Sequence, residues 1–559
     1  MTGFLRKTRS KQSFGQPRTR ESTPATQMHR SVGLELPDQY NLVDHFVDRH
    51  LREGRGGKTA IISSDQRLTY REIAEQVDRV GNGLLKLGLQ QEQRVLLVLP
   101  DVPEFAAAYF GAMKIGAVAV PTSTALRTSD YAYFLEESRA RIAIVHSAQF
   151  VEFRAALSDQ RYCTDVIVCG EPVDGYLDWT RFVNESLPKL ETARTSKDDA
   201  AFWLWTSGST GRPKAAVHSH GDWVYCCENY ARGVLDIQAD DVTFSSSKLF
   251  HAYGLGNGLM FPFHVGATTI LYSGKPHARA ILETAHANRP TLFFSVPTLY
   301  AAMLQEAGQG AAYDLRSVRL AVSAAEPLPA EIFRRWKERF GVEILDGIGS
   351  TEVLHIYLSA RGRQVRPGST GQAVPGYELA LFDHAGQPVA AGAIGDLMVC
   401  GPSTAQCYWN RLALTRDRMR GRWFFTGDKY SIDEDGYYWY AGRSDDMFRV
   451  SGQWVSPIEV ESALIEDPRV LEAAVIAFEE GNGLHTPKAF VVLREGCNGS
   501  QELVRELQDF VKHRITPYKY PRHIEFLAEL PKTAAGKVLR YKLREMGGRA
   551  ADMTGEKVG

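Results

Sequence analysis

The sequence of 559 residues lacks any long hydrophobic run. The nearest approach to one, Phe110 to Val120, is short and carries Lys114, whereas a membrane-spanning helix needs about 20 apolar residues. We therefore expect no membrane insertion. The sequence also lacks a net charge, because 65 Lys and Arg residues stand against 66 Asp and Glu residues. No overall field would draw the chain to nucleic acid, so any anionic ligand must be held by local groups.

Cysteines are few and show no pairing pattern. The seven cysteines are an odd number, include no CxxC pair and are spread over a long chain. This distribution argues against a disulfide framework or a zinc site and favours a reducing compartment, the cytoplasm. The fractions of hydrophobic residues, 44%, and charged residues, 23%, are those of an ordinary globular protein.

The two ends of the chain are predicted to lie outside the folded part. Residues 1–34 are basic, rich in Ser and Thr and without the apolar segment of a secretory signal. We expect them to form a disordered basic tail, with a transit peptide or a misassigned start upstream of Met28 as alternatives. Residues 549–559 are expected to form a flexible tail.

The periodicity of the remaining chain predicts an α/β fold. A helical pattern over 70–89 is followed by short apolar runs at 95–99, 142–146 and 166–170, which is typical of βα units around a buried sheet. Beyond about residue 375 the pattern changes to short strands separated by Gly and Pro turns, which indicates a small β subdomain.

A polar GRSDD stretch ending at Asp446 separates a large domain, 35–442, from a smaller one. We place a hinge at 443–446 and an α+β lid domain at 447–548. Within the lid, Ser456, Pro457 and Glu459 predict a capping box that opens a helix. Strands are expected at 473–478, 489–493 and 523–527, and a helix at 501–515.

The most informative segment for chemistry follows an apolar strand that begins near residue 201. Its glycines allow backbone N–H groups to converge on an anion, and its hydroxyls and lysine supply further donors, so the loop is suited to holding phosphates. The spacing does not fit a Walker loop, since Pro213 separates Arg212 from Lys214. The candidate phosphate-binding residues are Thr206, Ser207, Gly208, Ser209, Thr210, Gly211 and Lys214.

The segment TSGSTGRPK resembles the phosphate loop of the adenylate-forming superfamily, which includes acyl-CoA synthetases, peptide-synthetase adenylation domains and luciferases. A second segment, DGIGSTE, resembles that superfamily's second core motif. The resemblance implies that Thr351 contacts the α-phosphate of ATP and that Glu352 holds Mg²⁺. The residues of this motif included in the nucleotide site are Asp346, Gly347, Ile348, Gly349, Ser350 and Thr351.

Three further segments resemble nucleotide-binding motifs of the same superfamily. In FTGD, Asp428 matches the carboxylate that accepts hydrogen bonds from the ribose hydroxyls, and Arg443 resembles the second ribose contact. Asp445 occupies the hinge position, with a solvated loop acid as the alternative. The segment SAAEPLP resembles the adenine-side loop and contributes Ala324, Ala325 and Glu326, although the superfamily usually has glycine where this chain has Ala325.

The C-terminal segment PKTAAGK resembles the motif whose final lysine reaches the reacting carboxylate and phosphate. The resemblance therefore implies that Lys537 is catalytic in the first half-reaction. It also implies that the lid rotates to present Gly452 beside a pantetheine tunnel, where a glycine would allow a thiol arm to pass close to the backbone.

Over residues 35–546 the chain closely resembles benzoate:CoA ligases and their hydroxybenzoate relatives. That likeness implies an acyl pocket formed by Ala252, Tyr253, Gly349, His355 and Ile356. Core packing for Ala252 and Ile356, and a structural role for His355, are the alternatives. His251 departs from the phenylalanine common in these ligases, and it is included among the catalytic candidates because it can gate ATP or the acyl tunnel.

The implied activity is ATP-dependent ligation of a benzoate-type aryl carboxylate to coenzyme A through an acyl-AMP, with ATP, Mg²⁺ and CoA as cofactors. Two alternatives share these motifs: a stand-alone adenylation enzyme that loads a carrier protein, and a nucleotide-binding protein without turnover. The sequence leaves the exact acid open, and both a monomer and a homodimer are compatible with it.

Overall fold

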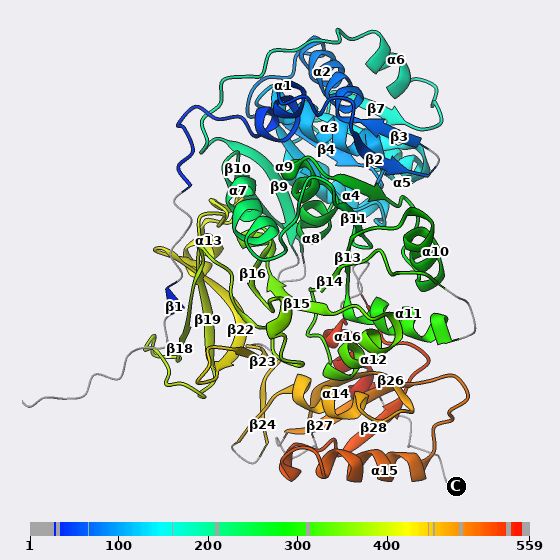
Figure 1. The fold of residues 1–559 in the computed structure, drawn as a ribbon, viewed down its shortest axis with the longest axis vertical. Helices are drawn as coiled ribbons and strands as arrows, with labels where there is room; N and C mark the ends of the chain where they lie inside the picture. The colour runs from blue at the N-terminus through cyan, green and yellow to red at the C-terminus, as the bar shows by residue number, and fades with distance from the viewer. Residues whose placement is uncertain are drawn as a thin grey trace, which may run out of the picture.

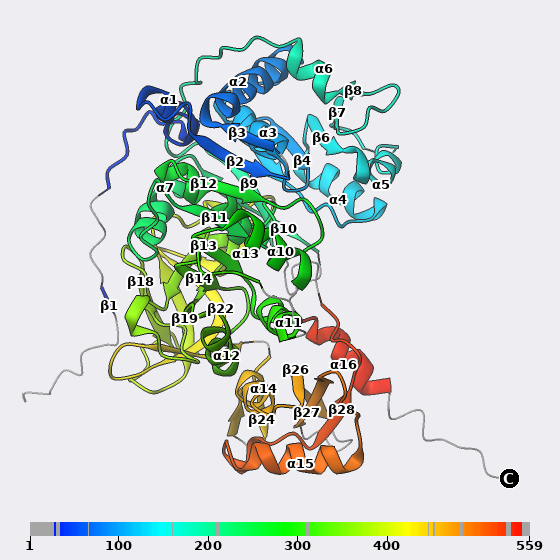
Figure 2. The same ribbon diagram turned by 45° about the vertical axis from the view of Figure 1, so that its right-hand side comes forward.

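The computed structural model describes residues 27–28, 34–64, 66–158, 160–206, 212–308, 313–444, 446–450, 453–479, 485–532 and 538–549. The chain forms a large mixed α/β part and a smaller C-terminal part below it (Figures 1 and 2). This arrangement confirms the predicted fold class. None of the helices in the described ranges is long and apolar enough to cross a bilayer, and all seven cysteines are free thiols.

The first sheet has eight strands, and most of its pairings are parallel, as expected for βα units. The three apolar runs predicted from the sequence form neighbouring strands of this sheet. In spatial order its strands are β20 (Cys407–Tyr408), β10 (Lys214–Ser219), β9 (Ala200–Thr206), β5 (Val118–Pro121), β4 (Arg94–Val98), β6 (Ile142–His146), β7 (Asp165–Cys169) and β8 (Leu177–Asp178).

The second sheet has nine strands and lies next to the first in the large part of the molecule. Its central strands are also parallel. In spatial order they are β17 (Gln372–Ala373), β16 (Ile356–Ser359), β15 (Ile344–Gly349), β14 (Leu320–Ser323), β13 (Leu292–Ser295), β11 (Val242–Ser245), β12 (Thr268–Leu271), β2 (Thr59–Ser63) and β3 (Gln66–Thr69).

Helices cover both faces of both sheets. Because successive strand residues point to opposite faces, each strand contributes side chains to two different cores. In β4, Val95 and Leu97 join a central core that also contains helices α2 and α3, whereas Leu96 and Val98 join an outer core with α4 and α5. Another outer core lies on the second sheet under α10, α11 and α12. These helices are α2 (Tyr70–Lys86), α3 (Pro103–Lys114), α4 (Thr128–Ser138), α5 (Phe150–Ala155), α10 (Ala278–Asn288), α11 (Pro297–Gly308) and α12 (Ala330–Phe340).

Short helical segments fill the connections. They are the π-helical turns η1 (Asp44–Asp48), η3 (Cys227–Arg232) and η4 (Gly256–Met260), the 3-10 turns η2 (Ser147–Gln149), η5 (Thr351–Val353), η6 (Gly362–Gln364) and η7 (Pro517–Lys519), and the helices α1 (Arg49–Arg52), α6 (Trp179–Asn184), α7 (Asp222–Cys226), α8 (Ala252–Leu255), α9 (Phe261–Val265) and α13 (Leu412–Arg418).

A third, antiparallel sheet forms the small β subdomain predicted beyond residue 375. Its first strand, however, comes from residues 27–28, which pair with the edge of β18 and so depart from the expected disordered tail. The unpaired N–H and C=O groups of an edge strand favour such an addition. Residues 1–26 and 29–33 lie outside the described ranges. The strands are β1 (Gln27–Met28), β18 (Glu378–Phe382), β19 (Gly395–Cys400), β22 (Trp423–Ile432), β21 (Met419–Arg420) and β23 (Tyr438–Arg443).

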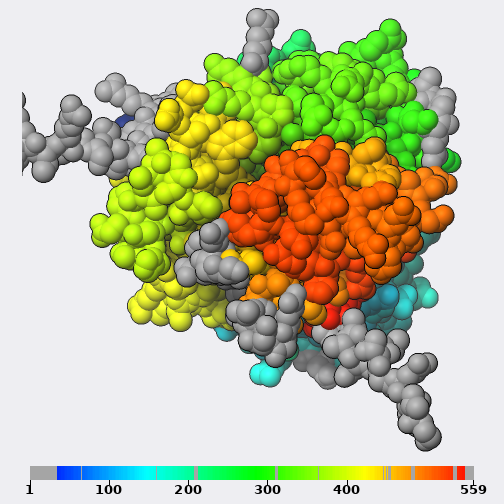
Figure 3. Space-filling model, turned by 90° about the horizontal axis from the view of Figure 1, so that it is seen from below, coloured from blue at the N-terminus to red at the C-terminus, as the bar shows by residue number. Residues whose placement is uncertain are grey.

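The C-terminal part has its own core on a three-stranded sheet. Viewed from below, it lies against the large part of the molecule (Figure 3). All three strands and the helix predicted after Ser500 are present. The elements are β24 (Phe448–Val450), β25 (Gln453–Val455), α14 (Pro457–Ile465), β26 (Val470–Glu479), β27 (His485–Leu493), α15 (Gln501–Lys512), β28 (His523–Phe526) and α16 (Arg540–Arg549).

The predicted capping box at the start of α14 forms only in part. The Ser456 hydroxyl accepts a hydrogen bond from the Glu459 backbone N–H, as predicted. The Glu459 carboxylate does not return to Ser456 and binds the Lys519 ammonium instead, at 2.7 and 2.6 Å. A charged partner from a distant turn therefore replaces the reciprocal half of the box.

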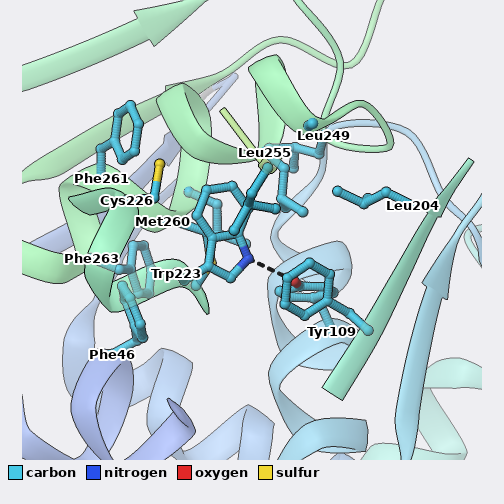
Figure 4. Close-up of a cluster of buried hydrophobic side chains, with 14 of the residues drawn as sticks. Phe46, Tyr109, Leu204, Trp223, Cys226, Leu249, Leu255, Met260, Phe261 and Phe263 are labelled. Carbon is cyan, nitrogen blue, oxygen red and sulfur yellow. Dashed lines mark hydrogen bonds between the residues drawn. The ribbon is translucent and has the colours of Figure 1, made fainter. Parts of the chain in front are cut away.

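A hydrogen bond joins two large side chains of the central core. Trp223 lies among Phe46, Phe261 and Phe263 (Figure 4), and its indole N–H donates to the hydroxyl of Tyr109 at 3.2 Å. Both residues are fully buried. The bond satisfies an indole N–H that would otherwise lack a partner in an apolar environment.

Tyr109→Phe should destabilise the large domain by about 1–3 kcal/mol, because the Trp223 N–H would remain buried without an acceptor. The measurement is the midpoint of urea unfolding, followed by tryptophan fluorescence. Tyr541→Phe removes a hydroxyl from a side chain that is half exposed and is the control. Equal midpoints for the two variants would contradict the expectation.

Candidate active site

A cavity of about 1000 Å³ lies between the large part of the molecule and the C-terminal part. Strand ends of all three large-domain sheets reach it, and so do residues just after β28. Fifteen of the predicted site residues line it: Thr206, Lys214, His251, Ala252, Tyr253, Ala324, Ala325, Gly349, Ser350, Thr351, Glu352, His355, Ile356, Asp428 and Arg443. Sequence segments more than 200 residues apart therefore meet in one place.

Other predicted residues do not line this cavity or fall outside the described part of the chain. Glu326, Asp346, Gly347 and Ile348 belong to segments that reach the cavity but are not in its wall. Asp346 is buried behind the wall, and burial raises the pKa of its carboxyl well above the usual range. Ser207, Gly208, Ser209, Thr210, Gly211, Asp445, Gly452 and Lys537 lie outside the described residues.

The two ends of the predicted phosphate loop are fixed by strand pairing. Thr206 ends β9, Lys214 begins β10, and the two residues are paired across the antiparallel ladder. The hydroxyl of Tyr133 on α4 donates to the carbonyl of Pro213 at 2.6 Å. The described ends of the loop are therefore held at the cavity by both the sheet and a side chain from a helix.

Lys214 and Glu352 form a buried ion pair in the cavity wall. The Lys214 ammonium lies 3.5 Å from Oε1 of Glu352, and burial lowers the pKa of this lysine despite the carboxylate beside it. The Tyr408 hydroxyl donates to the same carboxylate oxygen at 2.6 Å. The sequence contained no signal for Tyr408, because it reaches Glu352 only through the pairing of β20 with β10.

A buried histidine anchors the backbone that carries Thr351 and Glu352. Nε2 of the buried His218 contacts the Thr351 carbonyl at 2.8 Å, and its Nδ1 contacts the Asp222 carboxylate at the same distance. Two residues before Thr351, a Cβ on Gly349 would lie 2.4 Å from the carbonyl oxygen of His355. Glycine is therefore required there for the chain to turn from β15 towards β16.

Asp428 and Arg443 face each other across the hairpin of β22 and β23. The guanidinium Nη1 of Arg443 lies 3.0 Å from Oδ1 of Asp428. The carboxylate is 6% exposed and has two acceptor oxygens, a geometry suited to a pair of neighbouring hydroxyl donors. The structure thus brings together the two residues that were predicted to contact the ribose.

Ala325 adopts a backbone conformation that suits glycine. Its φ is +75°, in the left-handed region where a Cβ is costly, and it lines the cavity. A glycine at this position would adopt the same φ without this strain. The strain is located at the candidate nucleotide site, where such conformations tend to occur.

Aromatic and imidazole rings surround the small residues of the predicted acyl pocket. The Tyr253 hydroxyl donates to the carbonyls of Ser295 and Val322, at 3.2 and 3.1 Å, which fixes one wall. His355 lies against the rings of Tyr253 and Phe261, with centroids 5.5 and 4.5 Å away. Its Nε2 contacts the Tyr253 carbonyl at 3.3 Å.

Both histidines of this pocket are neutral near pH 7. Burial lowers the pKa of His355 to about 3 and that of His251 to about 4. Behind His355 lies Gly256, where a Cβ would come within 2.4 Å of the imidazole Cδ2. The pocket therefore offers an uncharged, ring-lined surface, and Gly256 is a determinant of its shape that has no sequence signature.

A second buried ion pair lies beside His251 and was not predicted. Asp101 follows β4 and accepts from the Leu249 N–H at 3.0 Å and lies 3.5 Å from the Lys248 ammonium, which lines the cavity. Burial raises the pKa of Asp101 to about 6 despite Lys248. Asp101 thus joins the first sheet to the segment that carries His251.

The C-terminal part contributes residues on both sides of the segment that contains Lys537. Leu530, Pro531 and Lys532 line the cavity before it, and Lys542 lines it afterwards. The Lys532 ammonium is tied to the Glu472 carboxylate at 2.7 Å. Among the described residues there is no cluster of three or more His, Cys, Asp or Glu side chains that could hold a metal ion. A Mg²⁺ ion bound through one carboxylate, phosphates and water needs no such cluster.

Comparisons with known proteins agree with this geometry. The chain matches the AMP-binding enzyme family over residues 47–409 and the AMP-binding enzyme C-terminal domain over 459–537, so it belongs to the AMP-binding enzyme family. It is 46% identical to the benzoate–CoA ligase of Thauera aromatica, over 91% of this chain and 97% of that protein.

The chain is also similar to two ligases whose names include substituted benzoates. The 4-hydroxybenzoate–CoA/benzoate–CoA ligase of Rhodopseudomonas palustris is 43% identical over 91% of this chain and 94% of its own length. The crystal structure of an anthranilate CoA ligase in complex with anthranoyl-AMP has a TM-score of 0.89 and 41% identity, covering 92% of this chain and 99% of that one.

Ala325→Gly should stabilise the protein by about 1 kcal/mol, because it removes the Cβ from a left-handed residue. The matched control is Ala324→Gly, the neighbouring buried position, whose φ is not positive. That change should destabilise by about 0.5–1 kcal/mol, since glycine adds freedom to the unfolded chain. Thermal unfolding midpoints measure both, and shifts of the same sign would contradict the role assigned to the backbone.

Proposed function

We propose that this protein is an AMP-forming ligase that joins a benzoate-type aryl carboxylate to coenzyme A through an acyl-AMP intermediate. The observation that carries the proposal is the single cavity in which the phosphate-loop ends, Glu352, the Asp428–Arg443 pair and the ring-lined pocket meet. The family and the aryl–CoA ligases that it resembles support the same reaction.

The first half-reaction joins two anions. A carboxylate oxygen of the acid attacks the α-phosphorus of ATP, a new P–O bond forms, and the bond to the bridging oxygen breaks to release pyrophosphate. Lys214 and Arg418 line the cavity and place positive charge where the negative charge of the transition state develops. Mg²⁺ held at Glu352 supplies further charge neutralisation for the phosphates.

In the second half-reaction the CoA thiolate attacks the acyl carbon of the mixed anhydride. The thioester C–S bond forms, and AMP leaves with the electrons of the C–O bond. We assign Asp428 and Arg443 to the ribose and the loop at Ala324 and Ala325 to the adenine side. Asp445 as hinge, Gly452 at the thiol path and Lys537 as the first-step catalyst rest on the resemblance of their segments.

We assign the aryl ring to the pocket of Ala252, Tyr253, Gly349, His355 and Ile356. The small residues at 252 and 349 leave space for a flat group, and the Tyr253 ring can stack on it. Because His251 and His355 are neutral, neither imidazole carries a charge that would pair with an ammonium or a second carboxylate. This favours benzoates with hydrogen or a small polar substituent on the ring.

We place the reaction in the cytoplasm, where free cysteines persist. All seven cysteines of the chain are unpaired, and ATP and CoA are both required as substrates of the proposed reaction.

The function is tested by AMP release from purified protein with ATP, Mg²⁺ and CoA. The panel should contain benzoate, hydroxy- and aminobenzoates, cyclohexanecarboxylate and octanoate. We expect kcat/KM for at least one benzoate to exceed that for octanoate by tenfold or more. A lack of acid-dependent AMP would contradict the function, and pyrophosphate exchange without acyl transfer to CoA would indicate a carrier-protein acceptor.

Lys537→Ala should lower the rate of adenylation about a thousandfold, because one ammonium about 4 Å from the developing charge is worth roughly 4 kcal/mol at an effective dielectric near 20. Thioester formation from supplied acyl-adenylate should change little. The two half-reactions are measured separately, by pyrophosphate exchange and by thioester formation. Comparable losses in both would contradict the assignment of Lys537 to the first step.

A further inference from the structure

The Glu352 carboxylate is held by the segment that precedes and includes β20. Glu352 is 7% exposed. Its Oε1 atom accepts a hydrogen bond from the Tyr408 hydroxyl at 2.6 Å, and its main-chain carbonyl accepts from the Ala405 N–H at 2.7 Å. The backbone and the side chain of Glu352 are therefore both fixed by residues three positions apart in one segment.

Tyr408 is itself rigidly placed. It is 2% exposed, it pairs with Ala216 in the first sheet, and its backbone N–H donates to the Thr415 hydroxyl at 3.0 Å. These contacts hold the phenol hydroxyl in place to donate to the Glu352 carboxylate.

Lys214 contacts both Glu352 and Tyr408. Its ammonium lies 3.5 Å from Oε1 of Glu352 and 3.9 Å from the centre of the Tyr408 ring. A lysine in this position has a cation–π contact in addition to its ion pair. If a bound phosphate drew the ammonium away, Glu352 would be free to hold the metal that accompanies the nucleotide.

We propose that Tyr408 is a positioning residue that fixes the orientation of the Glu352 carboxylate for the metal–nucleotide complex. The inference rests on the proposed function, in which Glu352 is the metal ligand. An O–H···O⁻ bond of 2.6 Å is charge-assisted and strong. A metal-ligating carboxylate with a hydrogen-bonded partner behind it typically loses 10- to 100-fold in metal affinity when the partner is removed.

Tyr408→Phe tests this inference, because it removes the hydroxyl and keeps the ring beside Lys214. The full-length variant is titrated with Mn²⁺ in the presence of α,β-methylene-ATP, and free Mn²⁺ is measured by electron paramagnetic resonance. We expect the Mn²⁺ dissociation constant to rise 10- to 100-fold. The Mg²⁺ concentration that half-saturates adenylation should rise by a similar factor, whereas the KM for the aryl acid should change less than twofold.

The control is Tyr70→Phe. Tyr70 is also buried and donates to the carbonyls of Ala267 and Pro262, at 2.6 and 3.4 Å, but it lies outside the cavity wall. It should leave Mn²⁺ binding unchanged. An Mn²⁺ constant for Tyr408→Phe within twofold of wild type would overturn the proposal, and so would an equal change in the control.

A double variant separates positioning from a general packing effect. If Tyr408 acts through the carboxylate, Tyr408→Phe should weaken Mn²⁺ binding no further when Glu352→Gln is already present. An additive loss would overturn the inference. Failure of the proposed function is distinguishable, because it would appear as absent acid-dependent AMP in the wild type, whereas Mn²⁺–nucleotide binding reports on Tyr408 without turnover.

Discussion

The pairing of charges in the cavity wall is the constraint on which the candidate active site depends. A cavity that binds a polyanionic nucleotide needs cations, yet an unpaired cation away from water is costly. Each of Lys214, Lys248, Arg443 and Lys532 is therefore within 3.5 Å of a carboxylate. Ligand binding can then proceed as an exchange of partners, in which phosphates or hydroxyls replace contacts that the protein already makes.

The same constraint distinguishes the two ends of the cavity. Ion pairs lie in the part of the cavity assigned to the nucleotide. At the proposed acyl pocket, burial keeps the imidazoles of His251 and His355 neutral, although the Asp101–Lys248 ion pair lies beside His251. A neutral, ring-lined pocket is compatible with an aromatic group and unfavourable to a second charge. The division of polarity therefore matches a substrate that is charged at its carboxylate and apolar elsewhere.

Most of the large-scale fold could be predicted from the sequence, and the site only in part. Strands such as β4, β6 and β7 have strong local patterns, and Asp428 and Arg443 are close because a hairpin connects them. The partners from distant segments could not be predicted: Tyr408 is 56 residues from Glu352, and Asp101 is 148 from Leu249. Their contacts are created by the packing of sheets, which no local pattern encodes. The half-formed capping box at Ser456 has the same cause, since Lys519 comes from a separate turn.

The close approach of Gly256 to His355 has a consequence for how such a pocket can diversify. Gly256 is not in the cavity wall, yet any side chain there would push the imidazole forward. In the proposed acyl pocket, the room available to a substituent on the aromatic ring is thus set partly by Gly256, which does not line the cavity. Substitutions that alter which acids are accepted need not touch the acid at all.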